Sequence, residues 1–478
     1  MTDRRPAGTW SQGLLALALA PCGLAACGGP DEAHDVVIAD GTVIDPESGF
    51  FEVANVGVRD GVVVTISSDR LVGERVIDAS GLVVSPGFVD LHEHGQSEEA
   101  YALMVRDGVT TALELEVGTP DVEGFYSERS GGQIVNYGVS IGHIGVRMHV
   151  LGDPGDFLPM GVGGSGTSTQ DDLDEMEGQI REGLDQGALA VGFGSAYTPG
   201  ADMAEIERMF AVAGEYGAPV HIHMRGGVTG LDSTITAARA AGAPLHIVHA
   251  NSSAGTDIEA FLATIEAARE AGQDVTTETY PYGAGMTEIT SALFDDWESW
   301  PDERFGDHQL VATGERLNRA TFGAARAAGG TVIIHSRSEE LTRAAVASPL
   351  TMIASDGYVE NGRGHPRTSG SYAKVLGRYV RDEGLLSLAD AVAKMTIMPA
   401  RRMESRTPAF ARKGRLRAGM DADITVFDPD LVADRATYED ATIPSVGIPY
   451  VMVAGVLVVD RGELTGARPG GPLRAPLR

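Results

Sequence analysis

Cysteine, lysine and long apolar runs are all scarce in this chain of 478 residues. Its two cysteines, Cys22 and Cys27, lie near the start, which excludes a disulfide framework or a cysteine-rich zinc site in the rest of the chain. Lys and Arg number 37 against 67 Asp and Glu, so the net charge is −30. This charge argues against nucleic acid or an anionic membrane surface as a partner. The 43% of hydrophobic residues still allows a large core.

No apolar run reaches the ~18 residues of a membrane-spanning helix. The chain begins instead with the pattern of an exported protein: Arg4 and Arg5 precede a short apolar stretch at 13–20. The tetrapeptide Leu-Ala-Ala-Cys that ends at Cys27 is similar to a bacterial lipobox. We expect a signal peptide over 1–27 and a lipoprotein anchored through Cys27, facing the periplasm or the cell exterior. The alternative is an ordinary cleaved signal in which Cys27 has no role.

Short β-branched runs dominate two segments that flank a long middle region. In the first, 34–86, the pair Asp60-Gly61 between two such runs is a strong hairpin turn. The second, 412–478, also contains short β-branched runs. We therefore expect both chain ends to build one small composite β-sandwich.

The middle region, 87–411, alternates apolar strands with helices rich in Ala, Glu and Arg. Eight strands in this alternation predict an α/β fold, a (β/α)₈ TIM barrel. Residues from about 283 to 347 fit no single crossover and are expected to be an insertion before the last strand. The eight candidate strands are 87–92, 111–116, 140–144, 189–193, 219–223, 245–249, 274–279 and 352–355.

Polar side chains follow or end several of these strands. Since the active site of such a barrel lies at the carboxyl ends of its strands, these side chains are expected to converge. Imidazoles and carboxylates at one barrel mouth predict a divalent metal site, most plausibly for zinc. Each residue alone has a structural alternative, and their joint placement carries the prediction. The residues are His92, His94, Glu114, Glu116, His221, His223, His249 and Asp356.

The run Pro-Gly-Phe-Val-Asp-Leu-His-Glu-His at 86–94 resembles the signature of the amidohydrolase superfamily. More narrowly, the chain resembles the D-aminoacylases (N-acyl-D-amino-acid deacylases), with matches in order along nearly its whole length. The resemblance implies a metal-dependent hydrolase that acts on a linear amide bond of a small molecule, with one or two zinc ions. Further matches are Gly-Val-Thr-Thr at 108–111, Thr-Tyr-Pro-Tyr at 279–282, Ser-Asp-Gly at 355–357, His-Pro-Arg at 365–367 and Thr-Gly-Ala-Arg-Pro-Gly at 465–470.

The resemblance implies roles for particular residues. His92 and His94 would hold the more buried metal with Asp356, while His223 and His249 would hold the other. His221 is the alternative to His223. For the substrate, Arg367 would anchor a carboxylate, Tyr282 would assist it, and His143 would orient the carbonyl, unless His143 is only structural.

Two departures from that family stand out. The D-aminoacylases carry a Cys ligand just after strand two, whereas this chain has Val117 there. Its neighbour Glu116 could bridge two metals, and Glu114 is the alternative. A bridging carboxylated lysine on strand four is excluded, because all three lysines follow strand eight. The family also often has a lysine two positions after the strand-six histidine, where this chain has Asn251.

The implied mechanism is attack of a metal-activated water on the amide carbonyl, with Asp356 as general base and then general acid. The most plausible activity is deacylation of N-acyl-D-amino acids. The departures keep open a dipeptidase, a cyclic-amide hydrolase or a lactonase on the same scaffold. A non-catalytic envelope binding protein is the remaining alternative, and it would have no need of six candidate ligands.

Overall fold

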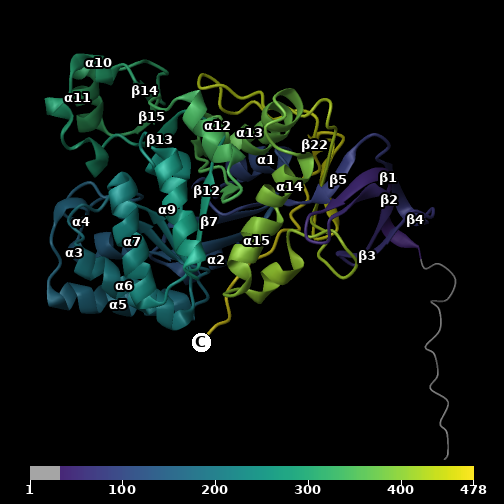
Figure 1. Ribbon diagram of the computed structural model, residues 1–478, viewed down its shortest axis with the longest axis horizontal. Coiled ribbons are helices and arrows are strands. Elements are labelled where there is room, and N and C mark those ends of the chain that lie inside the picture. The colour runs from purple at the N-terminus through teal and green to yellow at the C-terminus, as the bar shows by residue number, and fades with distance from the viewer. Residues whose placement is uncertain (1–32) are drawn as a thin grey trace, which may run out of the picture. The chain divides into compact units, whose positions relative to one another are not determined.

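Eight parallel strands form a barrel, as the alternation of strands and helices predicts (Figure 1). Their side chains are almost all buried, because the inner face fills the barrel and helices cover the outer face. Neighbouring strands pair in the order in which they occur along the chain. The strands are β6 (Phe88–Asp90), β7 (Val109–Thr119), β8 (Asn136–Gly142), β9 (Val191–Gly194), β10 (Val220–His223), β11 (Leu245–Ile247), β12 (Val275–Thr279) and β16 (Thr351–Ile353).

The computed structural model describes residues 33–478. The predicted signal peptide and Cys27 therefore lie outside the described residues. Within the described part, no helix is both long and apolar enough to cross a membrane.

The barrel closes just beyond the carboxyl ends of its first and last strands, β6 and β16. The backbone N–H of Asp356 donates to the carbonyl of His92 at 2.7 Å, and that of His94 donates to the carbonyl of Gly357 at 2.8 Å. Three of the predicted site residues thus lie on this seam, so closure of the barrel itself sets their spacing.

Helices follow most barrel strands. Several begin at a capping side chain that accepts a hydrogen bond from a free backbone N–H of the first turn. Examples are Thr169 before α5 and Asp202 before α6. In Figure 1, α5, α6, α7 and α9 lie next to one another on the outside of the barrel. The helices are α1 (Glu98–Arg106), α2 (Val122–Glu128), α3 (His143–Leu151), α4 (Val162–Ser165), α5 (Gln170–Asp185), α6 (Met203–Tyr216), α7 (Gly227–Ala241), α8 (Ala250–Ser253), α9 (Ile258–Glu270), α12 (Glu339–Ala347), α13 (Arg367–Lys374), the π-helical η3 (Val375–Asp382), α14 (Leu388–Met395), α15 (Ile397–Glu404) and η4 (Pro408–Arg412).

The segment between β12 and α12 builds a small unit with its own core. Its three antiparallel strands pair in the order β13, β15, β14, and an aromatic cluster that includes Phe294, Trp300 and Phe322 packs under them. Helix α12 packs against α8, α9 and β16, as a barrel helix does. The elements are β13 (Gly285–Glu288), η1 (Ala292–Phe294), η2 (Trp297–Ser299), α10 (Asp302–Phe305), β14 (His308–Leu310), α11 (Arg319–Ala328) and β15 (Thr331–Ile334), while β17 (Val359–Glu360) and β18 (Arg363–Gly364) form a short hairpin after β16.

Strands from both ends of the described chain share one nine-stranded sheet, in line with the predicted composite β-structure. Val63 of β3 also exchanges backbone hydrogen bonds with residues 419 and 420, shortly before β19, so the sheet folds over a common apolar core that includes Val56 and Ile424. The strands are β1 (His34–Asp45), β2 (Phe50–Arg59), β3 (Val62–Ser67), β4 (Gly73–Asp78), β5 (Val83–Pro86), β19 (Ile424–Phe427), β20 (Tyr450–Val453), β21 (Val456–Asp460) and β22 (Glu463–Leu464).

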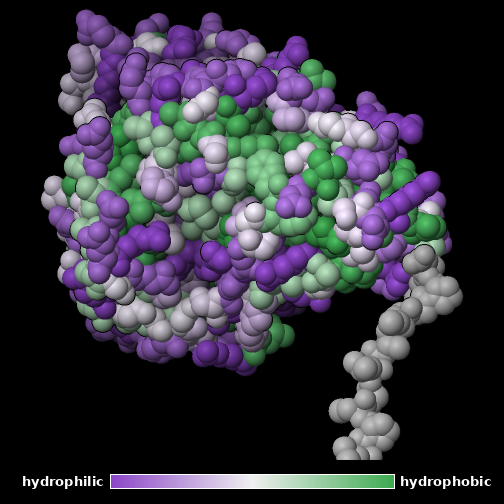
Figure 2. Space-filling model, turned by 45° about the vertical axis from the view of Figure 1, so that its right-hand side comes forward, coloured by the Kyte–Doolittle hydropathy of each residue, from purple (hydrophilic) through white to green (hydrophobic). Residues whose placement is uncertain are grey.

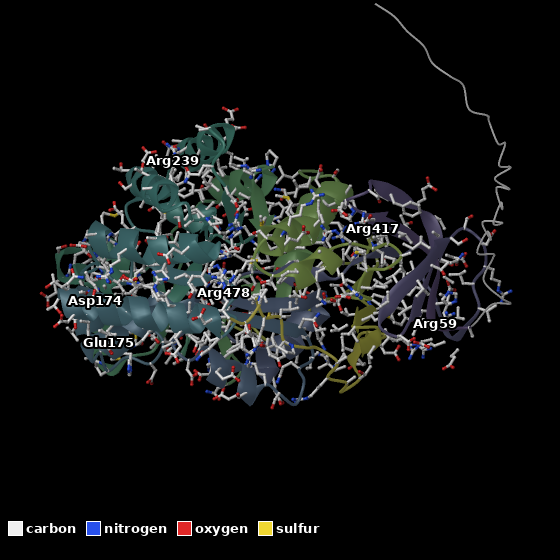
Figure 3. The ribbon with its side chains drawn as sticks, turned by 90° about the horizontal axis from the view of Figure 1, so that it is seen from below. Arg59, Asp174, Glu175, Arg239, Arg417 and Arg478 are labelled. Atoms are coloured by element: carbon white, nitrogen blue, oxygen red, sulfur yellow. The ribbon has the colours of Figure 1, made fainter. Side chains whose placement is uncertain are left out.

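Many charged side chains lie at the surface. Asp174 and Glu175 on α5 and Arg239 near the end of α7 point outward in Figure 3. Figure 2 shows a mainly hydrophilic surface, with apolar side chains gathered across the middle of the visible face.

Candidate metal centre

Four predicted residues meet at the barrel mouth. His92 and His94 follow β6, Glu116 lies on β7, and Asp356 follows β16. One ligand atom from each lies within 4.8 Å of the others. His92 Nε2 is 2.5 Å from Glu116 Oε2 and 3.0 Å from His94 Nε2, which in turn is 3.3 Å from Asp356 Oδ1. Two imidazoles and two carboxylates thus surround one point.

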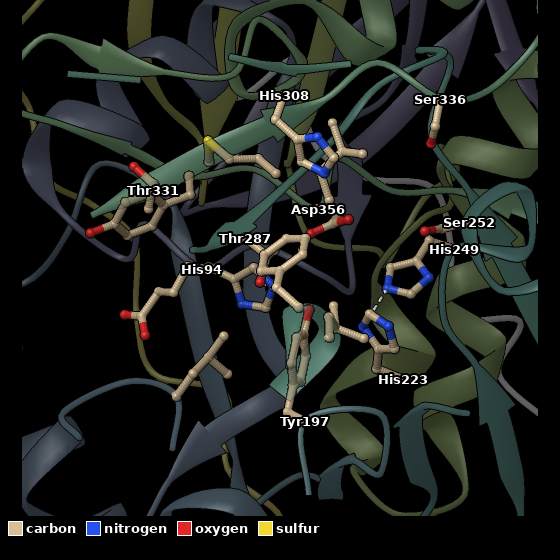
Figure 4. Close-up of a pocket in the computed structure, with 18 of the residues that line it drawn as sticks. His94, Tyr197, His223, His249, Ser252, Thr287, His308, Thr331, Ser336 and Asp356 are labelled. Atoms are coloured by element: carbon tan, nitrogen blue, oxygen red, sulfur yellow. Dashed lines mark hydrogen bonds and ion pairs between the residues drawn. The ribbon is translucent and has the colours of Figure 1, made fainter. Parts of the chain in front are cut away.

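A second group shares Glu116 with the first. His223, the last residue of β10, places Nδ1 3.0 Å from Glu116 Oε1. His249, which follows β11, places Nε2 3.2 Å from His223 Nδ1 (dashed in Figure 4). One oxygen of Glu116 therefore faces His92 and His94, and the other faces His223. This is the arrangement of a carboxylate between two metal positions.

Two further carboxylates fix the orientation of the first pair of histidines. Glu278 Oε1 lies 2.5 Å from His92 Nδ1, and Glu114 Oε2 lies 2.6 Å from His94 Nδ1. Although burial alone would raise it, contact with His92 and His246 lowers the pKa of Glu278 to about 2. An ionised carboxylate only accepts, so His92 donates from Nδ1 to Glu278, and with a metal bound in place of the second proton Nε2 would present its lone pair to that metal.

The centre strongly favours positive charge. Burial disfavours the imidazolium form of His92, but Asp356, Glu116 and Glu278 outweigh it and raise its pKa well above the usual value. Burial and the neighbouring His223 lower the pKa of His249 to about 3, which leaves a neutral imidazole. A negative field that attracts a proton also attracts a divalent cation. Nitrogen and carboxylate donors of this kind fit zinc.

Strained backbone accompanies two of these residues. His249 has φ 36° and Asp356 has φ 52°, in the left-handed region that residues with a Cβ rarely adopt. Such conformations persist where the surroundings enforce them, and they gather at functional sites. Here the strain aims both side chains into the barrel mouth.

A cavity of about 420 Å³ opens onto the centre. His94, His223, His249 and Asp356 lie at its base (Figure 4). Aromatic and apolar side chains form much of the wall, and many come from the β13–β15 unit. This unit therefore lies over the barrel mouth and forms a large part of the cavity wall. Its contributions are Gly285, Met286, Thr287, Glu288, Leu293, Phe294, Arg304, Asp307, His308, Thr331 and Ile334.

Arg367, at the start of α13, also lines the cavity, with 1% of its surface exposed. Its Nη1 lies 2.7 Å from Asp356 Oδ2. Burial would raise the pKa of Asp356, but the Arg367 guanidinium and His92 outweigh it and lower that pKa below the usual range. Asp356 is therefore an anion held between the two histidines and a cation.

Two predicted substrate-binding residues, Tyr282 and His143, lie outside the cavity wall, and so does His221, the predicted alternative to His223. Tyr282 points elsewhere and donates its hydroxyl to Asp434 at 3.2 Å, so the structure does not place it beside Arg367. His143 binds Glu205 at 2.8 Å and stacks on Phe193, the contacts of a structural histidine.

His221 is buried below the centre. Its ring stacks on His246, with 4.4 Å between the ring centroids. His223 is the histidine that faces Glu116.

The structure also distinguishes Glu116 from Glu114, the two glutamates predicted as alternatives on strand two. A register irregularity between β7 and β8 lies between Glu114 and Thr119, and Glu116 sits within it. Such a bulge re-aims side chains. Glu116 points into the centre, Glu114 stands behind His94, and Val117 lines the cavity without a ligand atom.

Sequence reasoning missed Glu278, Tyr280, Tyr197 and Arg337. Glu278 is the second-last residue of a buried strand, which is the same signal that marked Glu116. Tyr280 directly follows that strand. No comparable signal points to Tyr197 or Arg337, because each reaches the cavity from an irregular segment.

The fold and the centre together define a metal-dependent enzyme built on a (β/α)₈ barrel. The model of the amidohydrolase family matches residues 159–459, and the chain belongs to that family.

Two similar proteins come from Alcaligenes xylosoxydans xylosoxydans, and each match covers 97% of the relative. The N-acyl-D-glutamate deacylase is 29% identical over 93% of this chain, and the D-aminoacylase is 30% identical over 92%. A solved N-acyl-D-glutamate deacylase from Bordetella bronchiseptica, complexed with zinc and a phosphonate that mimics the tetrahedral intermediate, is 29% identical. It superposes with a TM-score of 0.81 over 93% of this chain and all of that one.

Proposed function

We propose that this protein is a zinc-dependent hydrolase that removes the acyl group from N-acyl-D-amino acids. The observation that carries the proposal is Glu116 between two histidine groups, with Asp356 and Arg367 paired in the wall of the adjoining cavity. The similarity to D-aminoacylase and N-acyl-D-glutamate deacylase supports the substrate class.

The metal ligands follow from the two groups. His92, His94 and Asp356 would hold one metal, His223 and His249 the other, and Glu116 would bridge them. A divalent metal in such a site lowers the pKa of bound water toward ~7 and polarises a carbonyl oxygen.

The chain's own residues supply the proton transfer and the substrate contacts. Asp356 is anionic, so it can take a proton from the attacking water and deliver it to the nitrogen of the leaving amine. Arg367 is a planar bidentate donor suited to the substrate carboxylate, and it holds Asp356 in place. The cavity wall limits access of bulk water to the reacting atoms.

Replacing Asp356 by Asn tests the proton transfer. We expect Asp356→Asn to lower kcat by about 10²–10⁴-fold, because the amide cannot accept the proton. His92, His94 and Glu116 should still retain metal in the variant, as measured by elemental analysis. Asp174→Asn, on the surface of α5, is the matched control and should keep full activity. A fully active Asp356→Asn variant would overturn the assignment.

A substrate panel tests the reaction. The zinc-loaded protein should hydrolyse N-acetyl-D-amino acids faster than their L-enantiomers, dipeptides, cyclic amides and lactones. Treatment with a strong chelator should remove activity, and added zinc should restore it. Preference for a cyclic amide or a lactone would move the chain to another activity on the same scaffold, and metal-independent turnover would refute the site.

We also propose that the protein is exported and anchored to a membrane through lipid on Cys27. The proposal rests on the apolar stretch and the lipobox-like tetrapeptide before Cys27.

A further inference from the structure

Several buried donor groups around one side of the cavity have no hydrogen-bond partner. They are the hydroxyl of Tyr280, Nη1 of Arg337 and Nε of Arg367. All three residues line the cavity, and Tyr280 is 1% exposed. A buried donor without an acceptor costs free energy, so three of them in one wall indicate a ligand that supplies acceptors.

One aromatic ring brings these donors together. The guanidinium carbon of Arg367 lies 4.6 Å from the centroid of the Tyr280 ring, and that of Arg337 lies 5.6 Å from it. Arg337 Nη2 donates to the hydroxyl of Ser252 at 2.6 Å, which leaves its other amino group free. Ser252 lies beside His249 in Figure 4, so Arg337 reaches close to the metal centre.

A glycine keeps the space in front of these donors open. A Cβ on Gly285 would lie 2.7 Å from Arg337 Nη2 and 3.2 Å from the Tyr280 hydroxyl. Any side chain there would displace the guanidinium. Gly285 does not have a positive φ, so the reason for glycine at this position is space and not backbone conformation.

The neighbouring helix α8 offers no positive charge here. Its Asn251 is buried and donates to the carbonyl of Tyr280 at 3.0 Å. The guanidinium that joins Arg367 at the Tyr280 ring comes instead from Arg337, in the segment that follows β15.

Arg367 is already the expected anchor of the substrate carboxylate, and what the structure adds is a second guanidinium. We propose that Arg337, beside the ring of Tyr280, supplies this second cation to a subsite for the α-carboxylate of the substrate and sets the affinity for it. A carboxylate accepts bidentate bonds from guanidinium groups and one more from a hydroxyl, which matches the free donors. The pair between Arg367 and Asp356 places this subsite beside the scissile nitrogen, and the α-carboxylate is one carbon away from that nitrogen. A side-chain carboxylate would lie farther off, toward β13–β15. The inference rests on the proposed function.

The test compares substrates with and without the carboxylate. For zinc-loaded Arg337→Met, kcat/KM on N-acetyl-D-methionine should fall about 100-fold, mainly through KM. On N-acetyl-D-methioninamide, which lacks the carboxylate, kcat/KM should stay within about 3-fold of that of the unmodified protein. Arg337→Lys should recover part of the loss. Arg239→Met on the surface of α7 should match the unmodified protein on both substrates.

Gly285→Ala tests the same subsite without removing a donor. It should raise KM for N-acetyl-D-methionine about 5- to 10-fold and leave the amide substrate unaffected. Zinc content of both variants, measured by elemental analysis, should equal that of the unmodified protein.

The possible results distinguish failure of the inference about Arg337 from failure of the proposed function. Equal losses on both substrates would make Arg337 a structural residue and overturn the inference. A loss limited to N-acetyl-D-glutamate would assign Arg337 to a side-chain carboxylate and also overturn it. Failure of the unmodified protein to hydrolyse any N-acyl-D-amino acid would refute the proposed function. In that event the binding of D-methionine, which resembles the product, is measured by calorimetry. The inference about Arg337 stands only if Arg337→Met binds D-methionine at least 10-fold more weakly than the unmodified protein does.

Discussion

Glu278 contacts the candidate centre only through His92. Substituting Glu278 therefore tests whether this contact orients the histidine. Its second oxygen lies 3.1 Å from His246 Nε2, and His246 Nδ1 in turn contacts the hydroxyl of Thr276 at 2.8 Å. This chain of contacts fixes the rotation of the His92 ring from below. The carboxylate also increases the basicity of the nitrogen that faces the metal.

Glu278→Gln should therefore weaken zinc binding by about 10- to 100-fold. The amide cannot provide the full negative charge that orients and polarises His92. Competition with a chromophoric chelator measures the zinc affinity directly, apart from turnover. Glu270→Gln on the exposed side of α9 is the control and should bind zinc normally. Unchanged affinity in Glu278→Gln would show that His92 is held by packing alone.

At the scale of single residues, the sequence predicts which side chains are present at strand ends but not how they are turned. His92, His94, His223, His249 and Asp356 could be selected because they end or follow apolar strands. The choice between Glu114 and Glu116 depends on the irregularity within β7, which no pattern of residue types reveals.

At the scale of elements, a buried ion cluster joins α3 to α6. Glu205 on α6 binds His143 at the start of α3 at 2.8 Å and forms an ion pair with Arg147 one turn further on. Burial alone would raise the pKa of Glu205, but His143 and Arg147 outweigh it and lower that pKa to about 2. The cluster holds α3 against the barrel, so the role of His143 is to join two helices.

Glu205→Gln should destabilise the protein by about 3 kcal/mol at pH 7, because Arg147 is left as a buried charge without its partner. The pKa of Glu205 is lower in the folded than in the unfolded chain. Its stabilising effect is therefore complete above about pH 4.5 and is lost as the pH falls toward 2. Urea unfolding at pH 7 and pH 3 should show a smaller gap between the variant and the unmodified protein at the lower pH. A constant gap would assign the loss to packing.

The elements themselves follow closely from the sequence. The predicted barrel strands match the observed ones to within a few residues, since apolar runs bounded by polar or glycine-containing turns are strong signals. The sequence predicts the β13–β15 unit only as an insertion. Its strands are 3–4 residues long, and their pairing is set by an aromatic core that is assembled from distant residues.

At the scale of the whole molecule, the two ends of the described chain meet in one sheet, whereas the active-site cavity lies at the barrel mouth. A net charge of −30 gives the protein no electrostatic attraction to an anionic membrane. If the protein is held at a membrane, the attachment has to come from acyl chains, each contributing ~0.8 kcal/mol per buried CH₂ group.

Cys27→Ser should therefore release the protein from the membrane. After expression in a bacterial host, the unmodified protein should partition into the detergent phase and its mature N-terminus should carry the mass of attached lipid. The Cys27→Ser variant should appear in the aqueous phase, because serine cannot accept the thioether-linked lipid. Cys22→Ser is the matched control, since Cys22 lies within the same predicted signal peptide, and it should behave like the unmodified protein. Aqueous partitioning of the unmodified protein would favour an ordinary cleaved signal, with the same catalytic barrel free in the exported compartment.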